Sequence, residues 1–581
     1  MSRGSALIWS LVCGAAVLGA CSSSAERSAS APASSFSNGS SSPTGGTSTA
    51  SAGATGTDFG GGNSSGGAGS SDADSALAHL PTRIRRLANV EYDTSVQVLL
   101  STKRSLAGGP DFPPDLRQDG FTVNDTQRID AVLVERLADA ADTLVDEAKQ
   151  NGTFARLAPC ETAADAANCA KRFIVTFGAK VYRRPLDDEE IEALMGLYSV
   201  GAEAASFQDG IAHVTRGLLQ SAGFLYLTEL GEGQPASDGT VRLTAHELAA
   251  SLSYFLTSAP PDAELLQKAS SGALFEPDER EAQARRLFEA NPAARDTVVR
   301  LVREWLGIDR IAESSKDSLV YPEFAEEKPK IVAESQDFVR AVAFESTGTV
   351  GELLGANWTV NSGPLSLYEV AGAGPLPGSS RLTGRIGILN QGAFLATYAN
   401  AHESHPIFRG VAVTRRVVCY PLDSPASFNL QVVPPAPDPS LTTRERFSVH
   451  PRDSICAGCH DIVDPFGFSF EQFDGMGRYR ERENGKQIDS AVRVAMDAEF
   501  DGPYADSNAL AAALSDSEIV RECFARFMFR AASATGDSAA TPGEREFVDA
   551  WRKIPEAARG NIVETLIAYV KSPSFAVRGG P

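Results

Sequence analysis

Helical periodicity constrains the fold of this chain more than any other feature of its sequence. Asp187 with Glu190, and Thr244 with Glu247, have the spacing of helix-capping boxes, and apolar residues recur after each pair at intervals of three and four. No segment of comparable length alternates with a period of two. We therefore expect a mainly α protein without a large sheet. Further helices are predicted at about 130–149, 282–305, 334–344, 391–399, 516–532 and 543–553.

The first 76 residues are expected to precede the folded part of the protein. Arg3 is followed by an apolar stretch at 6–18, too short to span a bilayer, and then by small residues directly before Cys21. Residues 1–20 are thus predicted to be a lipoprotein signal peptide and Cys21 the acylated first residue of the mature chain. The alternative is an ordinary cleaved signal with a chance cysteine at its boundary. Residues 21–76 are rich in Ser and Gly and predict a disordered tether. We expect a lipid-anchored protein of the bacterial cell envelope, facing the periplasm or the exterior.

The remaining residues are too many for one core, so we expect a multi-domain helical protein. Stretches rich in Gly or Pro divide the sequence into N-terminal helical domains at 77–235, a central helical domain at 240–372, a unit with a cysteine motif at 381–490 and a C-terminal helical domain at 500–581. The net charge of −21 has no basic cluster within it, which argues against a nucleic-acid partner.

The motif of that third unit is the run CAGCH at 456–460. The C-x-x-C-H spacing allows Cys456 and Cys459 to bond covalently to the vinyl groups of a haem, while His460 coordinates the iron. The cofactor that the motif predicts is therefore haem c. The alternatives are a disulfide between the two cysteines, or a zinc site.

The other cysteines predict disulfides. Cys160 and Cys169 are nine residues apart and could close a small loop before a helix, which leaves Cys419 and Cys523 as a long-range bridge. With Cys21 and the signal cysteine set aside, the count closes evenly. The remaining cysteines are also even in number if the two motif cysteines form a disulfide. The cysteine count therefore does not distinguish haem attachment from a disulfide.

A haem held by His460 needs a second axial ligand or an open position, and Met476 is the best single candidate because it follows in the same compact segment. The alternative for Met476 is core packing, and its flanking glycines equally suit a plain turn. His402 and His405 lack a third ligand, so we favour solvated loop histidines over a metal site there. The remaining weak candidates for the second position are His402, His405, His450 and Met496.

Several separated strings together resemble one known family. They are RRLANVEY at 85–92, FGAKVYRRPL at 177–186, LAASLSYFL at 248–256, GILNQGAFL at 387–395 and CAGCHDIVDPFGF at 456–468. They are similar to exported bacterial proteins built from consecutive domains of unknown function, the type centred on domain of unknown function 1592. The resemblance covers nearly the full mature chain and implies a cytochrome-c-like motif in the penultimate domain, but no established reaction.

Together these features predict an exported lipoprotein that binds haem c covalently and takes part in extracytoplasmic electron transfer or an oxidoreductase reaction. A redox partner protein is compatible with this function, and the membrane is reached through Cys21. The sequence leaves open whether the protein is an enzyme. The alternative function is a non-haem binding or scaffold lipoprotein whose C-x-x-C is a structural disulfide.

Overall fold

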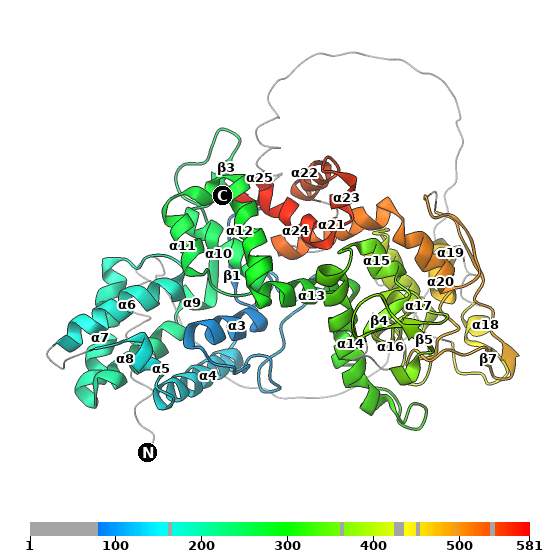
Figure 1. Ribbon diagram of the computed structural model, residues 1–581, viewed down its shortest axis with the longest axis horizontal. Helices are drawn as coiled ribbons and strands as arrows, with labels where there is room; N and C mark the ends of the chain where they lie inside the picture. Colours follow the sequence, from blue (N-terminus) through cyan, green and yellow to red (C-terminus); the bar gives the residue numbers. More distant parts are fainter. Residues whose placement is uncertain are drawn as a thin grey trace, which may run out of the picture. The chain divides into compact units, whose positions relative to one another are not determined.

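The structure is a computed structural model that describes residues 80–160, 165–360, 365–422, 435–448, 454–496, 498–534 and 541–580. The predicted signal peptide, Cys21 and the predicted tether lie outside the described residues. Helices dominate the described part (Figure 1), and its strands are two to four residues long. The mainly α fold class predicted from the sequence is therefore confirmed.

The N-terminal helices pack around one core cluster, to which Ala250 and Tyr254 of helix α10 (Ala245–Thr257) also contribute. Helix α7 (Asp188–Ala204) begins with the predicted capping box of Asp187 and Glu190. It packs against α8 (Phe207–Leu219), where the backbone of Gly210 lies close to the ring of Tyr198. The other elements of this region are β1 (Arg83–Arg86), α3 (Asn89–Leu100), α4 (Ala131–Gln150), α5 (Thr153–Leu157), α6 (Ala166–Tyr182), α9 (Ala222–Leu225) and β2 (Tyr226–Glu229).

The first helix of the central region is α10 (Ala245–Thr257), whose predicted capping box of Thr244 and Glu247 is present. The other elements of this region are β3 (Thr240–Arg242), α11 (Ala263–Ser270), α12 (Pro277–Ala290), α13 (Pro292–Leu306), α14 (Phe324–Glu345), α15 (Val350–Gly355), β4 (Trp358–Val360), β5 (Val370–Ala373) and β6 (Ser379–Leu382).

One predicted helix of this region was wrong in extent. The segment 282–305 forms two helices, α12 and α13, instead of one continuous helix. The side chain of Asn291 accepts a hydrogen bond from the backbone N–H of Ala293 and so caps the start of α13. Pro292 has no N–H with which to continue α12. The chain therefore leaves one helix and enters the next at the Asn-Pro pair.

The last third of the chain has shorter elements before its terminal helices. In order they are α16 (Gly392–Thr397), α17 (Pro406–Ala412), the π-helix η6 (Val413–Val417), α18 (Thr443–Phe447), α19 (Ser454–Phe468), β7 (Arg482–Glu483), β8 (Lys486–Gln487), β9 (Val492–Val494), β10 (Gly502–Tyr504), α20 (Ser507–Ser515), α21 (Glu518–Ser533), α22 (Pro542–Trp551), α23 (Glu556–Arg559), α24 (Ile562–Lys571), α25 (Pro573–Ala576) and β11 (Val577–Gly579).

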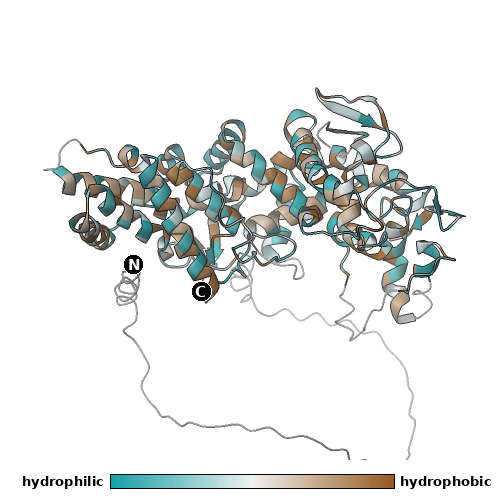
Figure 2. Ribbon diagram, turned by 90° about the horizontal axis from the view of Figure 1, so that it is seen from below, coloured by the Kyte–Doolittle hydropathy of each residue, from teal (hydrophilic) through white to brown (hydrophobic). Residues whose placement is uncertain are grey.

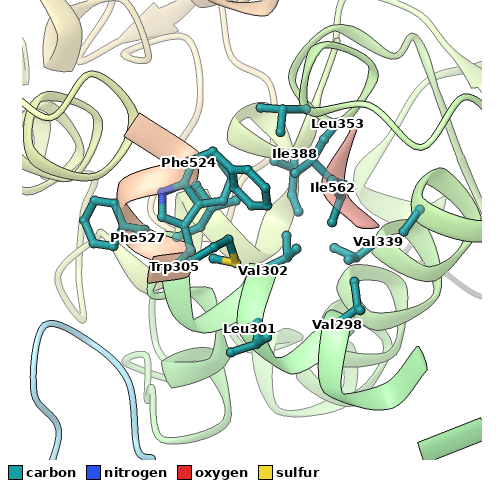
Figure 3. Close-up of a cluster of buried hydrophobic side chains, with 14 of the residues drawn as sticks. Val298, Leu301, Val302, Trp305, Val339, Leu353, Ile388, Phe524, Phe527 and Ile562 are labelled. Atoms are coloured by element: carbon teal, nitrogen blue, oxygen red, sulfur yellow. The ribbon is translucent and has the colours of Figure 1, made fainter. Parts of the chain in front are cut away.

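A second, larger core cluster joins the central helices to the terminal ones. Trp305 of α13 packs edge to face against Phe524 of α21, with ring centroids 5.0 Å apart. Figure 3 shows these two rings beside Val302 of α13, and Ile562 of α24 lies across the same cluster. The helices beyond residue 500 thus bury their apolar faces against the central region.

Sheet structure in the described residues is limited to five small antiparallel sheets. The largest has three strands in the order β4-β6-β5. Individual helices carry both hydrophilic and hydrophobic residues (Figure 2), as expected of helices with one buried face. Among the described residues, no helix combines the length and the apolar character needed to cross a membrane.

The first and last described segments are paired with each other. Gly579 donates its N–H to the carbonyl of Leu80 at 2.7 Å and accepts from the N–H of Thr82 at 3.1 Å, while β11 pairs with β3. Beneath this contact, the buried carboxylate of Glu229 accepts hydrogen bonds from Arg83 at 2.7 Å and Arg578 at 2.9 Å. Burial raises the pKa of Glu229, but Arg578 and Arg83 outweigh it and hold that pKa well below its usual range.

Candidate functional site

The C-x-x-C-H motif lies in the first half of helix α19. Cys456 and Cys459 are three residues apart on this helix and so lie on one face, about one turn from each other. Both thiols are free, Cys456 being half-buried and Cys459 exposed. A β-carbon added at Gly458, between them, would meet no atom of the described residues within 4 Å. In the described part of the chain, the two free thiols therefore have open space beside them.

His460 follows the second cysteine and is held by a carboxylate one turn further on. Its Nδ1 lies 2.8 Å from Oδ1 of Asp464, and the side chains are 17% and 10% exposed. An ionised carboxylate only accepts hydrogen bonds, so we assign the proton of the pair to Nδ1. This assignment leaves Nε2 as the atom that can bind a metal. The sequence analysis missed Asp464, although its i+4 spacing from His460 is visible in the sequence.

The second half of α19 is fixed by close packing against α17, and the two helices lie side by side (Figure 1). A β-carbon at Gly410 of α17 would lie 2.3 Å from the carbonyl oxygen of Val463, and one at Gly467 would lie 2.1 Å from that of Pro406. Only glycines allow this crossing. Phe466, between these contacts, is fully buried in the larger core cluster. The motif therefore lies in the first half of α19, ahead of the residues that pack closely against α17.

Both predicted disulfides are present. Cys160 is bonded to Cys169, with their Cα atoms 5.6 Å apart, and Cys419 is bonded to Cys523, with their Cα atoms 5.4 Å apart. The first closes a short loop onto the start of α6, and the second joins the chain just after η6 to α21. No bond joins the two motif cysteines, which are the free cysteines of the described residues.

Met476 occupies a tight turn and points into the core. Its side chain is 0% exposed and belongs to the larger core cluster. The carboxylate of Asp474 accepts hydrogen bonds from the backbone N–H groups of Met476 and Arg478, each at 2.9 Å. Gly477 has a φ of 96°, which a turn of this kind requires. Gly477 thus serves a turn, whereas a β-carbon at Gly475 would lie 2.9 Å from the backbone of Glu403. The ligand role of Met476 stays a prediction.

The histidine pair before α17 has two different environments. His402 is exposed, with its Nδ1 3.0 Å from the carboxylate of Asp317. His405 is 4% exposed, caps α17 by accepting from the N–H of Phe408 at 3.2 Å and stacks on the Phe408 ring. Burial, with Arg409 nearby, lowers the pKa of His405 to about 4. Solvated loop histidines were the favoured interpretation, which was right for His402 and wrong for His405, because the ring of His405 serves as a helix cap.

The other candidates for a second ligand were His450 and Met496. His450 lies outside the described residues, and Met496 is partly buried against the larger core cluster. No group of three or more His, Cys, Asp or Glu side chains in the described part of the chain is arranged to hold a metal ion. The donor set of α19, two free thiols and one imidazole with Nδ1 occupied, is the set that covalent haem attachment needs.

Four family models match consecutive parts of the chain, each described as a protein of unknown function. They are PSD3 (DUF1587) at residues 85–150, PSD5 (DUF1595) at 169–229, PSD4 (DUF1592) at 243–370 and PSCyt3 (DUF1588), which is cytochrome-c-like, at 385–483. The PSCyt3 match includes helix α19 and the turn of Met476. Comparison with curated proteins and with solved structures found no match.

Proposed function

Because the chain is a multi-domain protein of the DUF1592 and cytochrome-c-like DUF1588 families, we propose that it binds haem c covalently through Cys456 and Cys459, with His460 as axial ligand. The protein then takes part in electron transfer or an oxidoreductase reaction outside the cytoplasm. When bound, haem supplies one-electron redox chemistry. The chain's own residues attach the macrocycle, orient the imidazole and fix the helix that carries both.

One observation carries this proposal. The two motif thiols are free and lie one turn apart in the first half of α19, whereas the other described cysteines are paired in disulfides. The scaffold alternative requires a disulfide between Cys456 and Cys459, which the structure does not contain. We therefore do not propose it.

Haem staining on a denaturing gel tests the attachment directly, because only covalently bound haem survives denaturation. The full chain is produced in the periplasm together with haem-maturation machinery. We expect a stained band and a Soret absorbance for the wild type, and neither for Cys456→Ala/Cys459→Ala. The matched control is Cys160→Ala/Cys169→Ala, which also removes two cysteines and should still stain. A stain that persists without Cys456 and Cys459, or a wild type without stain, contradicts the proposal.

We further propose Met476 as the second axial ligand, on the strength of its position soon after His460 in the same domain. Met476→Ala should then remove the charge-transfer band of iron–thioether ligation and lower the reduction potential. The buried position alone predicts a loss of about 2–5 kcal/mol in stability. A destabilised variant with an unchanged spectrum would make Met476 a core residue and leave the second position to another ligand or open.

The location of the protein is proposed from the sequence. Cys21 is the lipidated residue, and it anchors the protein to a membrane of the bacterial envelope, where a redox partner protein is met. Nucleic acid is not a partner in this proposal. Cys21→Ser should release a folded, haem-stained protein into the soluble fraction. Retention of that variant on membranes after a carbonate wash would show a second anchor.

A further inference from the structure

We propose that Asp464 is a positioning residue that fixes the orientation of His460 and strengthens it as an electron-donating ligand. This inference rests on the proposed haem attachment at α19. It concerns a residue outside the C-x-x-C-H motif, and it states whether that residue raises or lowers the reduction potential of the bound haem.

The geometry of the pair supports a specific hydrogen bond. Asp464 lies four residues after His460 on α19, so the two side chains are on the same face of the helix. Oδ1 of Asp464 is 2.8 Å from Nδ1 of His460, the length of a charge-assisted N–H···O bond. With Nδ1 donating to Asp464, the ring presents the lone pair of Nε2 in one fixed direction.

The surroundings make this bond stronger than one on an open surface. Asp464 is only 7% exposed as a whole residue, so water competes little for its carboxylate. Its position is fixed because the adjacent Val463 packs against Gly410 of α17, and Phe466 is fully buried just beyond. The carboxylate therefore stays in place whichever charge the metal centre carries.

A carboxylate partner changes what the imidazole does to a bound metal. The negative charge draws the Nδ1 proton, which increases the electron density at Nε2 and raises its basicity as a ligand. A more electron-rich ligand stabilises the oxidised metal more than the reduced metal and so lowers the reduction potential. We infer a centre that is harder to reduce than the same haem with a neutral hydrogen-bond partner for His460.

Asp464→Asn tests this, since the amide oxygen can still accept from Nδ1 while the charge is lost. Covalent haem should remain, because the two cysteines are untouched. At a fixed applied potential the ratio of reduced to oxidised protein should rise, and each tenfold rise corresponds to a positive shift of ~59 mV for one electron. The matched control is Asp461→Asn, which removes the same charge from an exposed position beside His460 and should shift the ratio far less.

A second measurement does not depend on haem. Nitrogen-15 NMR of the imidazole rings reports the protonated nitrogen, and we expect the Nδ1–H form for His460, with an altered signal in Asp464→Asn and not in Asp461→Asn. If the wild type lacks haem but shows this form, the proposed function fails while the pairing stands. An Nε2–H form of His460, equal shifts in the two variants, or loss of covalent haem from folded Asp464→Asn overturns the inference.

Discussion

Replacing Gly467 by alanine should destabilise helix α19, because it would push α19 away from α17. The added β-carbon would lie 2.1 Å from the carbonyl oxygen and 2.7 Å from the carbonyl carbon of Pro406, both backbone atoms that no rotamer change can move. Overpacking of this kind costs about 1–3 kcal/mol, and the backbone obstacle favours the upper end. Alanine recovers about 1 kcal/mol of helix propensity relative to glycine. The net loss should be about 2 kcal/mol.

The same helix offers a matched control in Gly458→Ala. There a β-carbon would meet no atom of the residues that the structure describes within 4 Å, and the C-x-x-C-H spacing is kept. The propensity gain is therefore unopposed and should stabilise α19 by up to about 1 kcal/mol. The two variants carry the same chemical change, so the difference of about 3 kcal/mol between them measures the contact with α17.

Hydrogen exchange of the peptide covering 454–468 measures this difference in the segment itself. A difference of about 3 kcal/mol corresponds to opening constants that differ by roughly 100-fold, with α19 opening more often in Gly467→Ala. Both variants should still stain for haem. Equal exchange in the two variants, or greater protection in Gly467→Ala than in Gly458→Ala, would refute the close crossing of α17 and α19.

Two further predictions concern stability. Burial raises the pKa of Glu334 from 4.5 to about 7. The contribution of its protonated side chain to the free energy of unfolding is therefore fully present below pH 4.5 and is lost as the pH rises through 7. Glu334→Gln should remove up to about 3 kcal/mol of that pH dependence, seen as closer urea midpoints at pH 5 and pH 8 than in the wild type; an unchanged difference contradicts it. The second prediction concerns the two disulfides, Cys160–Cys169 and Cys419–Cys523, whose cysteines are 9 and 104 residues apart. The loss of entropy in the unfolded chain predicts that they stabilise the fold by ~2.6 and ~4.7 kcal/mol, respectively. Double alanine variants should therefore differ by about 2 kcal/mol in urea unfolding, and equal losses would count against this account.

Local signals explain how much of the fold was predictable. The capping boxes at Asp187 and Thr244 each placed a helix start correctly, because the signal and the structure that it specifies lie within four residues. The Asn291-Pro292 pair is a local signal for the break between α12 and α13. The apolar periodicity continues through this pair, however, and favoured one long helix. The small sheets could not be predicted, since β1 pairs with a strand about 140 residues later and neither is long enough to show a period.

The candidate site was predictable to the extent that its spacing is short. Cys456, Cys459 and His460 were predicted as haem-binding residues from five consecutive residues, and that role stays a prediction. The two disulfides were predicted from the number of cysteines left over and are present. Asp464 was missed because its role depends on the helix continuing to its position, and the proline that follows it is a usual sign that a helix ends. The close crossing at Gly410 and Gly467 needed the tertiary structure, since nothing local distinguishes these glycines from turn residues.

The pairing of Gly579 with residues 80–82 imposes an order on biosynthesis. Arg83 and Glu229 leave the ribosome hundreds of residues before Arg578, which is the third member of their buried charge network. In a nascent chain, β1 and β2 therefore lack the contacts of Arg578 and Gly579 until residues 577–579 have been synthesised. A chain truncated before that point would lack Arg578, so the buried Glu229 carboxylate would keep its ion pair with Arg83 and lose the second one, which destabilises the fold. The N-terminal region is therefore complete only when the C-terminal strand β11 has been made, and truncated products would be more open to proteolysis.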